Sequence, residues 1–242
     1  PFTPWGPLGP IRPFIFNLCE LLISTHPNNS KSYSIFADYL LQDKQTEKAL
    51  KYFKKSVALE KQKYALWNQI IIIESNLNKL EELKEDSKSA MEIFPTQPTF
   101  YYFNGYANSK LGNYQDAVFS LNIGKELVLE DHYLLAEFHQ LLGDAYHKLD
   151  DHALSDLNYD LSLEQHPNNP FVLNNYSYYL ALRRESLEKA KTMIQRAIEL
   201  NTENANYLDT YGWILFLEKK YKDSEFWLLK AIDFGGAKNG TI

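Results

Sequence analysis

The sequence predicts an all-α protein, a right-handed solenoid built from about thirteen helices. Three observations predict this fold class. Apolar residues recur at i, i+3, i+4 and i+7, short phrases return at a regular interval, and proline is rare after residue 13. Five of the ten prolines lie in residues 1–13, so long helices are permitted in the rest of the 242-residue chain.

Recurring phrases set the period. The string His-Pro-Asn-Asn occurs at 26–29 and again at 166–169, a separation of four periods of about 35 residues. Small residues stand where two helices would approach closely, namely Ala49, Ala90, Gly105, Gly143, Ala197 and Gly212. Together these phrases resemble the tetratricopeptide repeat, a helix–turn–helix unit of about 34 residues.

The resemblance divides the chain. It implies a Pro-rich leader at 1–13 and a single solenoid at 14–242, which opens with half a repeat at 14–29. Six repeats would follow at about 30–63, 64–97, 98–135, 136–169, 170–204 and 205–238. The leader has a proline at every third residue, which suits a polyproline II ligand or an extended, poorly ordered segment. A first residue other than Met predicts a fragment or a processed chain.

In the first half of the chain, residues 14–26 are expected to form the second helix of the half repeat, with Ile15, Leu18, Cys19 and Leu22 buried. Repeats one to three are recognised by their apolar and small residues. Repeat one has Phe36, Ala37, Leu40, Ala49 and Phe53. Repeat two has Trp67, Ile70, Ile71, Leu83 and Ala90, and repeat three has Tyr101, Gly105, Ala117 and Leu121. The run of four isoleucines at 70–73 favours a strand by propensity. A helix is predicted instead, because Trp67, Leu77, Leu80 and Leu83 continue the helical register around it.

In the second half, an insertion of four residues near 126–137 is expected to lengthen the flanking helices. Repeat four is recognised by Leu142, Gly143, Tyr146 and Tyr159. Repeat five has Leu173, Tyr176, Leu180, Ala190 and Ile194, and repeat six has Leu208, Tyr211, Gly212, Leu228 and Ala231. A one-residue insertion falls near 183–186 in repeat five.

Four polar residues occupy positions that the repeat reserves for its core, namely Glu74, Ser87, Asn104 and Asn108. Because buried polar groups need partners, we expect hydrogen bonds among them or to ordered water. The alternative for Glu74 is a side chain that tilts out to solvent.

Several function classes are excluded by composition and motif. A net charge of −6 argues against a nucleic-acid-binding surface, and no apolar run approaches the ~20 residues of a membrane-spanning helix. One cysteine and six scattered histidines predict neither a disulfide framework nor a metal site. No catalytic constellation or phosphate loop is recognised, so neither catalytic residues nor a cofactor are expected.

The resemblance also indicates where a partner would bind. In this family, the first helix of each repeat lines the concave face. The residues expected on it are Asn68, Tyr102, Tyr106, Gln140, Asp144, Asn174, Tyr178, Asp209, Trp213 and Phe216. Aromatic residues are enriched in binding hot spots, amides can pair with an extended backbone, and the two aspartates favour a basic segment. The alternative is that these side chains pack against the next repeat.

The predicted function is a non-enzymatic scaffold that binds a peptide or protein segment in its concave groove. Two alternatives stay open: a recruitment or regulatory arm of a larger enzyme or envelope assembly, and a small-molecule or glycan binder on the aromatic floor. The sequence resembles bacterial members of the family. This favours the periplasmic side of the cell envelope over the cytoplasm, with the oligomeric state left open.

Overall fold

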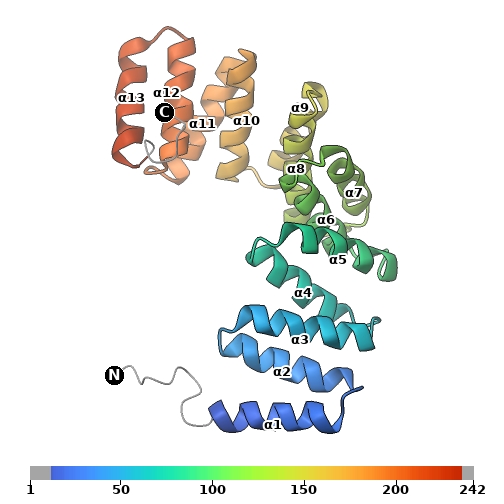
Figure 1. Ribbon diagram of the computed structural model, residues 1–242. Helices are drawn as coiled ribbons and strands as arrows, with labels where there is room; N and C mark the ends of the chain where they lie inside the picture. Colours follow the sequence, from blue (N-terminus) through green and yellow to red (C-terminus); the bar gives the residue numbers. More distant parts are fainter. Residues whose placement is uncertain (1–11, 236–242) are drawn as a thin grey trace. The chain divides into compact units, whose positions relative to one another are not determined.

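The computed structural model describes residues 12–235, so the predicted Pro-rich leader lies, except for its last two residues, outside the described part. Within that part the chain is all-helical and contains no strand (Figure 1). The helices are α1 (Arg12–Thr25), α2 (Ser30–Gln42), α3 (Thr46–Leu59), α4 (Tyr64–Asn76), α5 (Leu80–Ile93), α6 (Pro98–Lys110), α7 (Tyr114–Glu126), α8 (His132–Lys148), α9 (His152–Gln165), α10 (Pro170–Arg183), α11 (Leu187–Leu200), α12 (Ala205–Leu217) and α13 (Tyr221–Asp233). The isoleucine run lies inside α4, which confirms the helical prediction for it.

The helices group into two compact units, residues 1–127 and 128–242. Helices α1–α7 belong to the first unit and α8–α13 to the second. Each unit contains its own cluster of buried apolar side chains. A single solenoid over 14–242 stays a prediction.

Helix starts follow the predicted period. In the first unit α2, α4 and α6 begin at residues 30, 64 and 98, and α3, α5 and α7 begin at 46, 80 and 114. The repeated His-Pro-Asn-Asn string ends one helix and caps the next, because the side chains of Asn29 and Asn169 accept hydrogen bonds from the first amides of α2 and α10.

The four-residue insertion lengthens only one of its flanking helices. Helix α8 has 17 residues, against 13 in α6, whereas α7 keeps 13 and ends at Glu126. The expectation that both helices lengthen is therefore wrong for α7. Asp131 accepts a hydrogen bond from the Leu134 amide at 2.9 Å, and this N-cap starts α8 after the non-helical residues 127–131.

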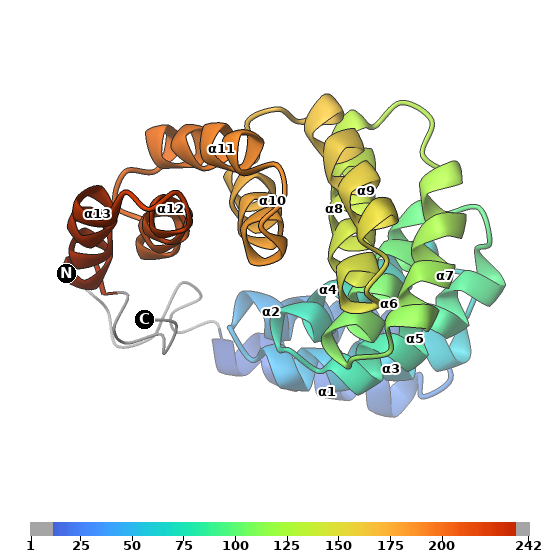
Figure 2. The same ribbon diagram turned by 90° about the horizontal axis from the view of Figure 1, so that it is seen from above.

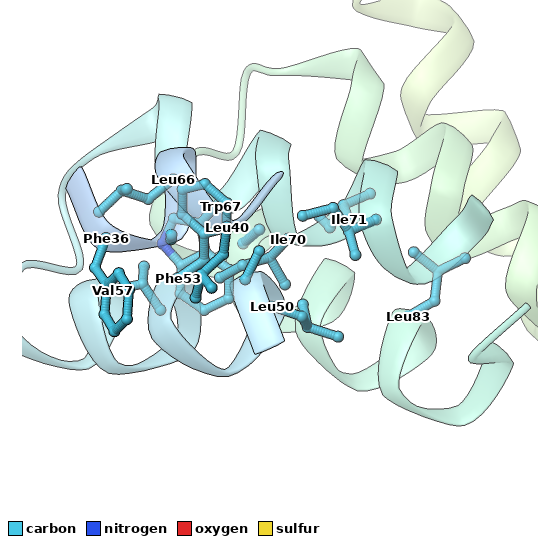
Figure 3. Packing of buried hydrophobic residues seen from close by; sticks show 14 of the residues in the cluster. Phe36, Leu40, Leu50, Phe53, Val57, Leu66, Trp67, Ile70, Ile71 and Leu83 are labelled. Atoms are coloured by element: carbon cyan, nitrogen blue, oxygen red, sulfur yellow. The ribbon is translucent and has the colours of Figure 1, made fainter. Parts of the chain in front are cut away.

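The core of the first unit extends from α1 to α6, and Figure 3 shows side chains of α2, α3, α4 and α5 within it. Phe36, Leu40, Phe53 and Ile70 are almost completely buried, and burial of each such side chain stabilises the fold by about 1.5–3 kcal/mol. On α1, Cys19 is buried as predicted but Leu18 is 53% exposed. Leu18 was expected in the core; it lies on a different side of α1 from Cys19, which packs into the core with α2.

The polar residues at core positions are buried and paired. Glu74 is fully buried, and its Oε1 lies 2.6 Å from Lys54 Nζ, which also lies 2.8 Å from Asp86 Oδ2. Asn104 donates to Ser87 Oγ at 3.0 Å and accepts from Asn108 Nδ2 at 3.0 Å. The expected network therefore joins three of the four residues, and Glu74 is paired with Lys54 instead of tilting out to solvent.

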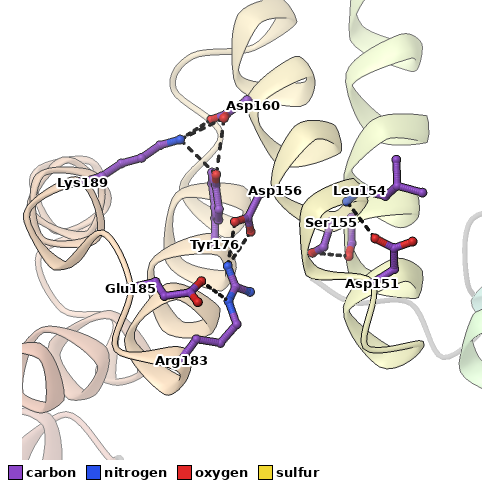
Figure 4. A network of polar contacts seen from close by, with 10 residues as sticks. Asp151, Leu154, Ser155, Asp156, Asp160, Tyr176, Arg183, Glu185 and Lys189 are labelled. Atoms are coloured by element: carbon purple, nitrogen blue, oxygen red, sulfur yellow. Dashed lines mark hydrogen bonds and ion pairs between the residues drawn. The ribbon is translucent and has the colours of Figure 1, made fainter.

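In the second unit, polar contacts tie α9 to α10 and α11 (Figure 4). Arg183 Nη2 donates to both carboxylate oxygens of Asp156 at 2.7 Å, in a site where the Arg183 side chain is only 9% exposed. Lys189 Nζ lies 2.6 Å from Asp160 Oδ1 and donates to the Tyr176 hydroxyl at 3.0 Å. Tyr159 stacks on Tyr176 with ring centroids 5.1 Å apart. These contacts hold α10 in place for the surface described next.

Candidate functional site

Two adjacent helices of the second unit, α10 and α12, carry half of the residues predicted to bind a partner (Figure 2). Their starts are fixed by asparagine caps. Asn169 accepts from the Phe171 amide at 3.1 Å, and Asn204 accepts from the Asn206 amide at 3.0 Å. Pro170 stands at the first helical position of α10, where its missing N–H has no cost.

Aromatic side chains stand exposed on these helices. The rings of Trp213 and Phe216 stack with centroids 5.5 Å apart and an interplanar angle of 13°. They are 37% and 47% exposed, and Tyr178 on α10 is 40% exposed. We call the set Asn174, Tyr178, Asp209, Trp213 and Phe216 the α10–α12 surface.

Polar groups complete the α10–α12 surface. Thr210 donates to Asn174 Oδ1 at 2.9 Å, which links the two helices, and Asn174 Nδ2 donates to Asn175 at 3.3 Å. Asp209 is half-buried, and burial raises the pKa of its carboxyl group above the ordinary value. It stands one helical turn before Trp213, so the carboxyl group and the indole project from the same side of α12.

The predicted residues of α8 are engaged inside the second unit. Asp144 accepts a hydrogen bond from the hydroxyl of Tyr159, and Gln140 Oε1 accepts from Asn169 Nδ2 at 3.2 Å. His147 stacks on Tyr179 with centroids 3.6 Å apart. Asp144 and Gln140 therefore help to join α8 to its neighbours, and Asp209 is the stronger candidate for contact with a basic group.

The three remaining predicted residues lie in the first unit. Asn68 on α4 and Tyr102 and Tyr106 on α6 are all half-buried. Tyr102 packs edge-on against Phe103 at 5.3 Å, and the Lys110 ammonium lies 5.6 Å from the centroid of the Tyr106 ring. Tyr102 and Tyr106 stand one turn apart on the same side of α6.

Sequence reasoning missed Tyr221 at the start of α13. Its ring lies 5.5 Å from that of Phe216 and it is 57% exposed, so it extends the aromatic area of the α10–α12 surface. The prediction considered only the first helix of each repeat, and Tyr221 begins a second helix. Its aromatic character directly after a polar turn was the available signal.

Neither a metal centre nor a membrane span is found among residues 12–235. In that range no three His, Cys, Asp or Glu side chains are placed to hold a metal ion. The helices there also lack any segment that is both long and apolar enough to cross a bilayer.

No protein-family model matches the chain. A TPR repeat-containing protein of Pseudomonas aeruginosa is 33% identical over 70 residues, which are 29% of this chain and 12% of that protein. This chain therefore matches only a small part of its curated relative.

Solved structures match over most of the chain. YrrB, described as a TPR protein with an unusual peptide-binding site, has a TM-score of 0.60 at 19% identity and covers 76% of this chain and 92% of its own. The protein pilF of Pseudomonas aeruginosa has a TM-score of 0.68 at 14% identity, over 86% of this chain and 92% of its own. The Cut9–Hcn1 structure of the APC/C has a TM-score of 0.67 at 16% identity, over 93% of this chain and 44% of its own. At these identities the likeness is one of fold.

Proposed function

We propose that this chain, a tetratricopeptide repeat solenoid with bacterial relatives, is a non-enzymatic scaffold that binds an extended peptide on its α10–α12 surface. The fold is one of protein–protein interaction, which supports the general role. The observation that carries the specific role is a group of exposed aromatic rings. Trp213 stacks on Phe216, Tyr221 is tilted against Phe216, and Tyr178 lies on the adjacent α10.

The chemistry of the α10–α12 surface suits a particular kind of peptide. Stacked, mutually supported rings offer apolar area with little loss of side-chain entropy on binding. Asn174 keeps lone pairs and an N–H for an extended backbone, since its amide makes two of its possible hydrogen bonds. Asp209 beside Trp213 favours a lysine or arginine side chain, which can pair with the carboxylate and lie over the indole.

A peptide-selection experiment tests this function. The purified chain would be used to select from a phage-displayed random peptide library, and selected peptides would be measured by fluorescence anisotropy. We expect an aromatic or aliphatic residue near a basic residue in the selected sequences. Trp213→Ala and Tyr178→Ala should each weaken binding about thirtyfold, the effect of a hot spot of about 2 kcal/mol.

The matched control is Phe226→Ala, which removes a 60% exposed aromatic ring from α13. Lys51→Ala on α3 is a second control. Both should leave affinity unchanged while all variants keep wild-type helicity. Equal losses from Phe226→Ala and Trp213→Ala, or selected peptides that bind Trp213→Ala as well as the wild type, would overturn the proposal.

We propose the cell envelope as the location of this chain. The only support is that its sequence resembles bacterial members of the repeat family. Fractionation of native cells with detection of this chain tests it, and recovery with the cytoplasmic fraction would contradict it.

A further inference from the structure

The first unit contains a polar cleft that is separate from the α10–α12 surface. Helices α5, α6 and α7 enclose about 340 Å³ of space. Its lining includes Lys88 and Met91 from α5, Asn108 from α6, and Phe119 and Ser120 from α7.

The period of 34 residues lets this cleft be compared with the preceding helices of the same unit. Helices α3, α4 and α5 begin 34 residues before α5, α6 and α7, respectively. Lys54, Glu74 and Asp86 therefore correspond to Lys88, Asn108 and Ser120. In the earlier set, one ammonium lies within 2.8 Å of both carboxylates. In the later set, the lysine is kept and both carboxylates are replaced by neutral side chains.

Apolar volume is lost at the same place. Leu50, Phe53 and Ile70 are buried in the earlier set of helices, and their counterparts are Lys84, Ser87 and Asn104. Replacing a phenylalanine by a serine removes a whole ring from the equivalent position. The cleft lies at these positions, since Lys84 and Asn104 line it, and amide and hydroxyl groups form its floor.

The floor groups largely satisfy one another. Ser120 donates to Asn104 Oδ1 at 2.6 Å, and Asn104 Nδ2 donates to Ser87 and to the Lys84 carbonyl at 3.0 Å. Lys88, by contrast, is exposed and forms no ion pair with any residue that the structure describes. It is the positive group left at the cleft.

Other charges around the cleft limit what it can hold. Lys84 is paired with Glu81 at 2.6 Å and with Glu85 at 3.7 Å. Glu85 and Asp116 also line the cleft, so a multiply charged anion would be repelled. A single negative charge matches the one lysine.

We propose that this cleft binds a carboxylate group. The bound carboxylate lies next to Lys88, in the way that the carboxyl groups of Glu74 and Asp86 lie next to Lys54. The Lys88 ammonium donates to the carboxylate, and the Asn113 amide and the Ser120 hydroxyl border the same space. The apolar part of the ligand lies against Met91 and Phe119. The carboxylate comes either from an acidic side chain of a partner peptide or from a small free acid.

The chain offers a clean probe, because it has only two methionines. Met91 lines the cleft, whereas Met193 is buried in the core of the second unit. The full chain would be labelled with ¹³C-methyl methionine and titrated, as followed by NMR, with a capped Gly-Glu-Gly peptide and with propionate. Sodium chloride at equal ionic strength, the capped Gly-Gln-Gly peptide and inorganic phosphate are the comparison ligands.

We expect the Met91 methyl signal to shift saturably with the glutamate peptide while Met193 stays in place. Saturation by propionate at similar affinity would identify a small acid as the source, and a marked preference for the peptide would identify an acidic side chain. Lys88→Gln should weaken binding about tenfold or more, and the matched Lys51→Gln on α3 should not. Ser120→Asp, which restores an internal carboxylate, should abolish binding.

Thermal melting checks that Lys88→Gln remains folded, as expected for an exposed side chain. The proposal is overturned if Met91 does not respond to either carboxylate. Equal binding by Lys88→Gln, an equal response to the glutamine peptide, or tighter binding of phosphate would overturn it too. Because the cleft lies in the first unit, these results are independent of peptide binding on the α10–α12 surface.

Discussion

Glu74 shows how an ionisable residue can occupy a core position of a repeat. Burial raises the pKa of its carboxyl group to about 8, the neighbouring Lys54 opposes this rise, and Asp86 adds to it. A pKa of about 8 favours the protonated form of Glu74 at neutral pH, and the Lys54 ammonium contacts both Glu74 and Asp86. When Glu74 is protonated, Asp86 is the one negative charge beside the Lys54 ammonium. The buried cluster is therefore close to neutral.

Truncation of Glu74 should destabilise the first unit. Glu74→Ala removes the partner of Lys54 and leaves space in the core, and we expect a loss of ~1–3 kcal/mol in the free energy of unfolding. Glu74→Gln should cost clearly less at neutral pH, because the amide has nearly the same shape and charge as the protonated acid. Urea unfolding followed by circular dichroism measures both. Equal losses from the two variants would show that the carboxylate is ionised.

At the residue scale, the sequence predicted which polar residues are buried but only part of their pairing. The repeat register places Glu74, Asn104 and Asn108 in the core without any coordinates. Lys54 and Asp86, in contrast, stand on helix faces that look solvated in the sequence. Their approach to Glu74 depends on how three helices pack. The hydrogen bond between Tyr159 and Asp144 also depends on helix packing, so it could not be predicted from the sequence either.

At the scale of single helices, the 34-residue step predicted most boundaries, since helix starts follow it closely. The segment 127–131 was not predictable from the repeat, because an insertion has no counterpart in the pattern. There the local cap at Asp131 decides where α8 begins. The small residues, unlike the insertion, correctly indicated where two helices approach closely, because such an approach leaves no room for a larger side chain.

Gly105 provides the test of that close approach between α6 and α7. A Cβ atom at this position would lie 2.4 Å from Leu121 Cγ, which is too close for both side chains. We expect Gly105→Ala to destabilise the chain by ~1–3 kcal/mol, the usual cost of overpacking, despite the better helix propensity of alanine. Chemical denaturation of the single variants and the double variant with Leu121→Ala measures the effect.

The double-mutant comparison isolates the cause. In the Leu121→Ala background the contact is gone, so Gly105→Ala should there be neutral or stabilising. If its cost were the same in both backgrounds, the clash with Leu121 would not explain the glycine.

At the scale of the whole molecule, the two units contain titrating groups with opposite effects on stability. Glu74 in the first unit has a folded-state pKa of about 8, above its ordinary value of 4.5. The stability that it contributes is present below pH 4.5 and is lost as the pH rises through 8.

His147 in the second unit behaves in the opposite way. Its pKa is lowered from an ordinary 6.5 to about 4; burial is the largest cause, and the nearby Lys148, His152 and Arg183 contribute to the shift. Folding therefore excludes a proton that the unfolded chain binds, so stability is complete above pH 6.5 and is lost as the pH falls toward 4.

These two responses predict separate unfolding transitions with opposite pH shifts. Each unit has its own core, and stability in repeat arrays is largely a sum of local terms, so calorimetry should resolve two transitions. As the pH rises from about 5 to about 6.5, Glu74 should lower the free energy of unfolding of the first unit and His147 should raise that of the second unit. Each change is at most about 1.4 kcal/mol per pH unit, and the two transition temperatures should move in opposite directions. Glu74→Gln should remove the first shift alone. His147→Phe, which keeps a ring against Tyr179, should remove the second alone. A single transition that both variants alter together would mean that the two units unfold as one.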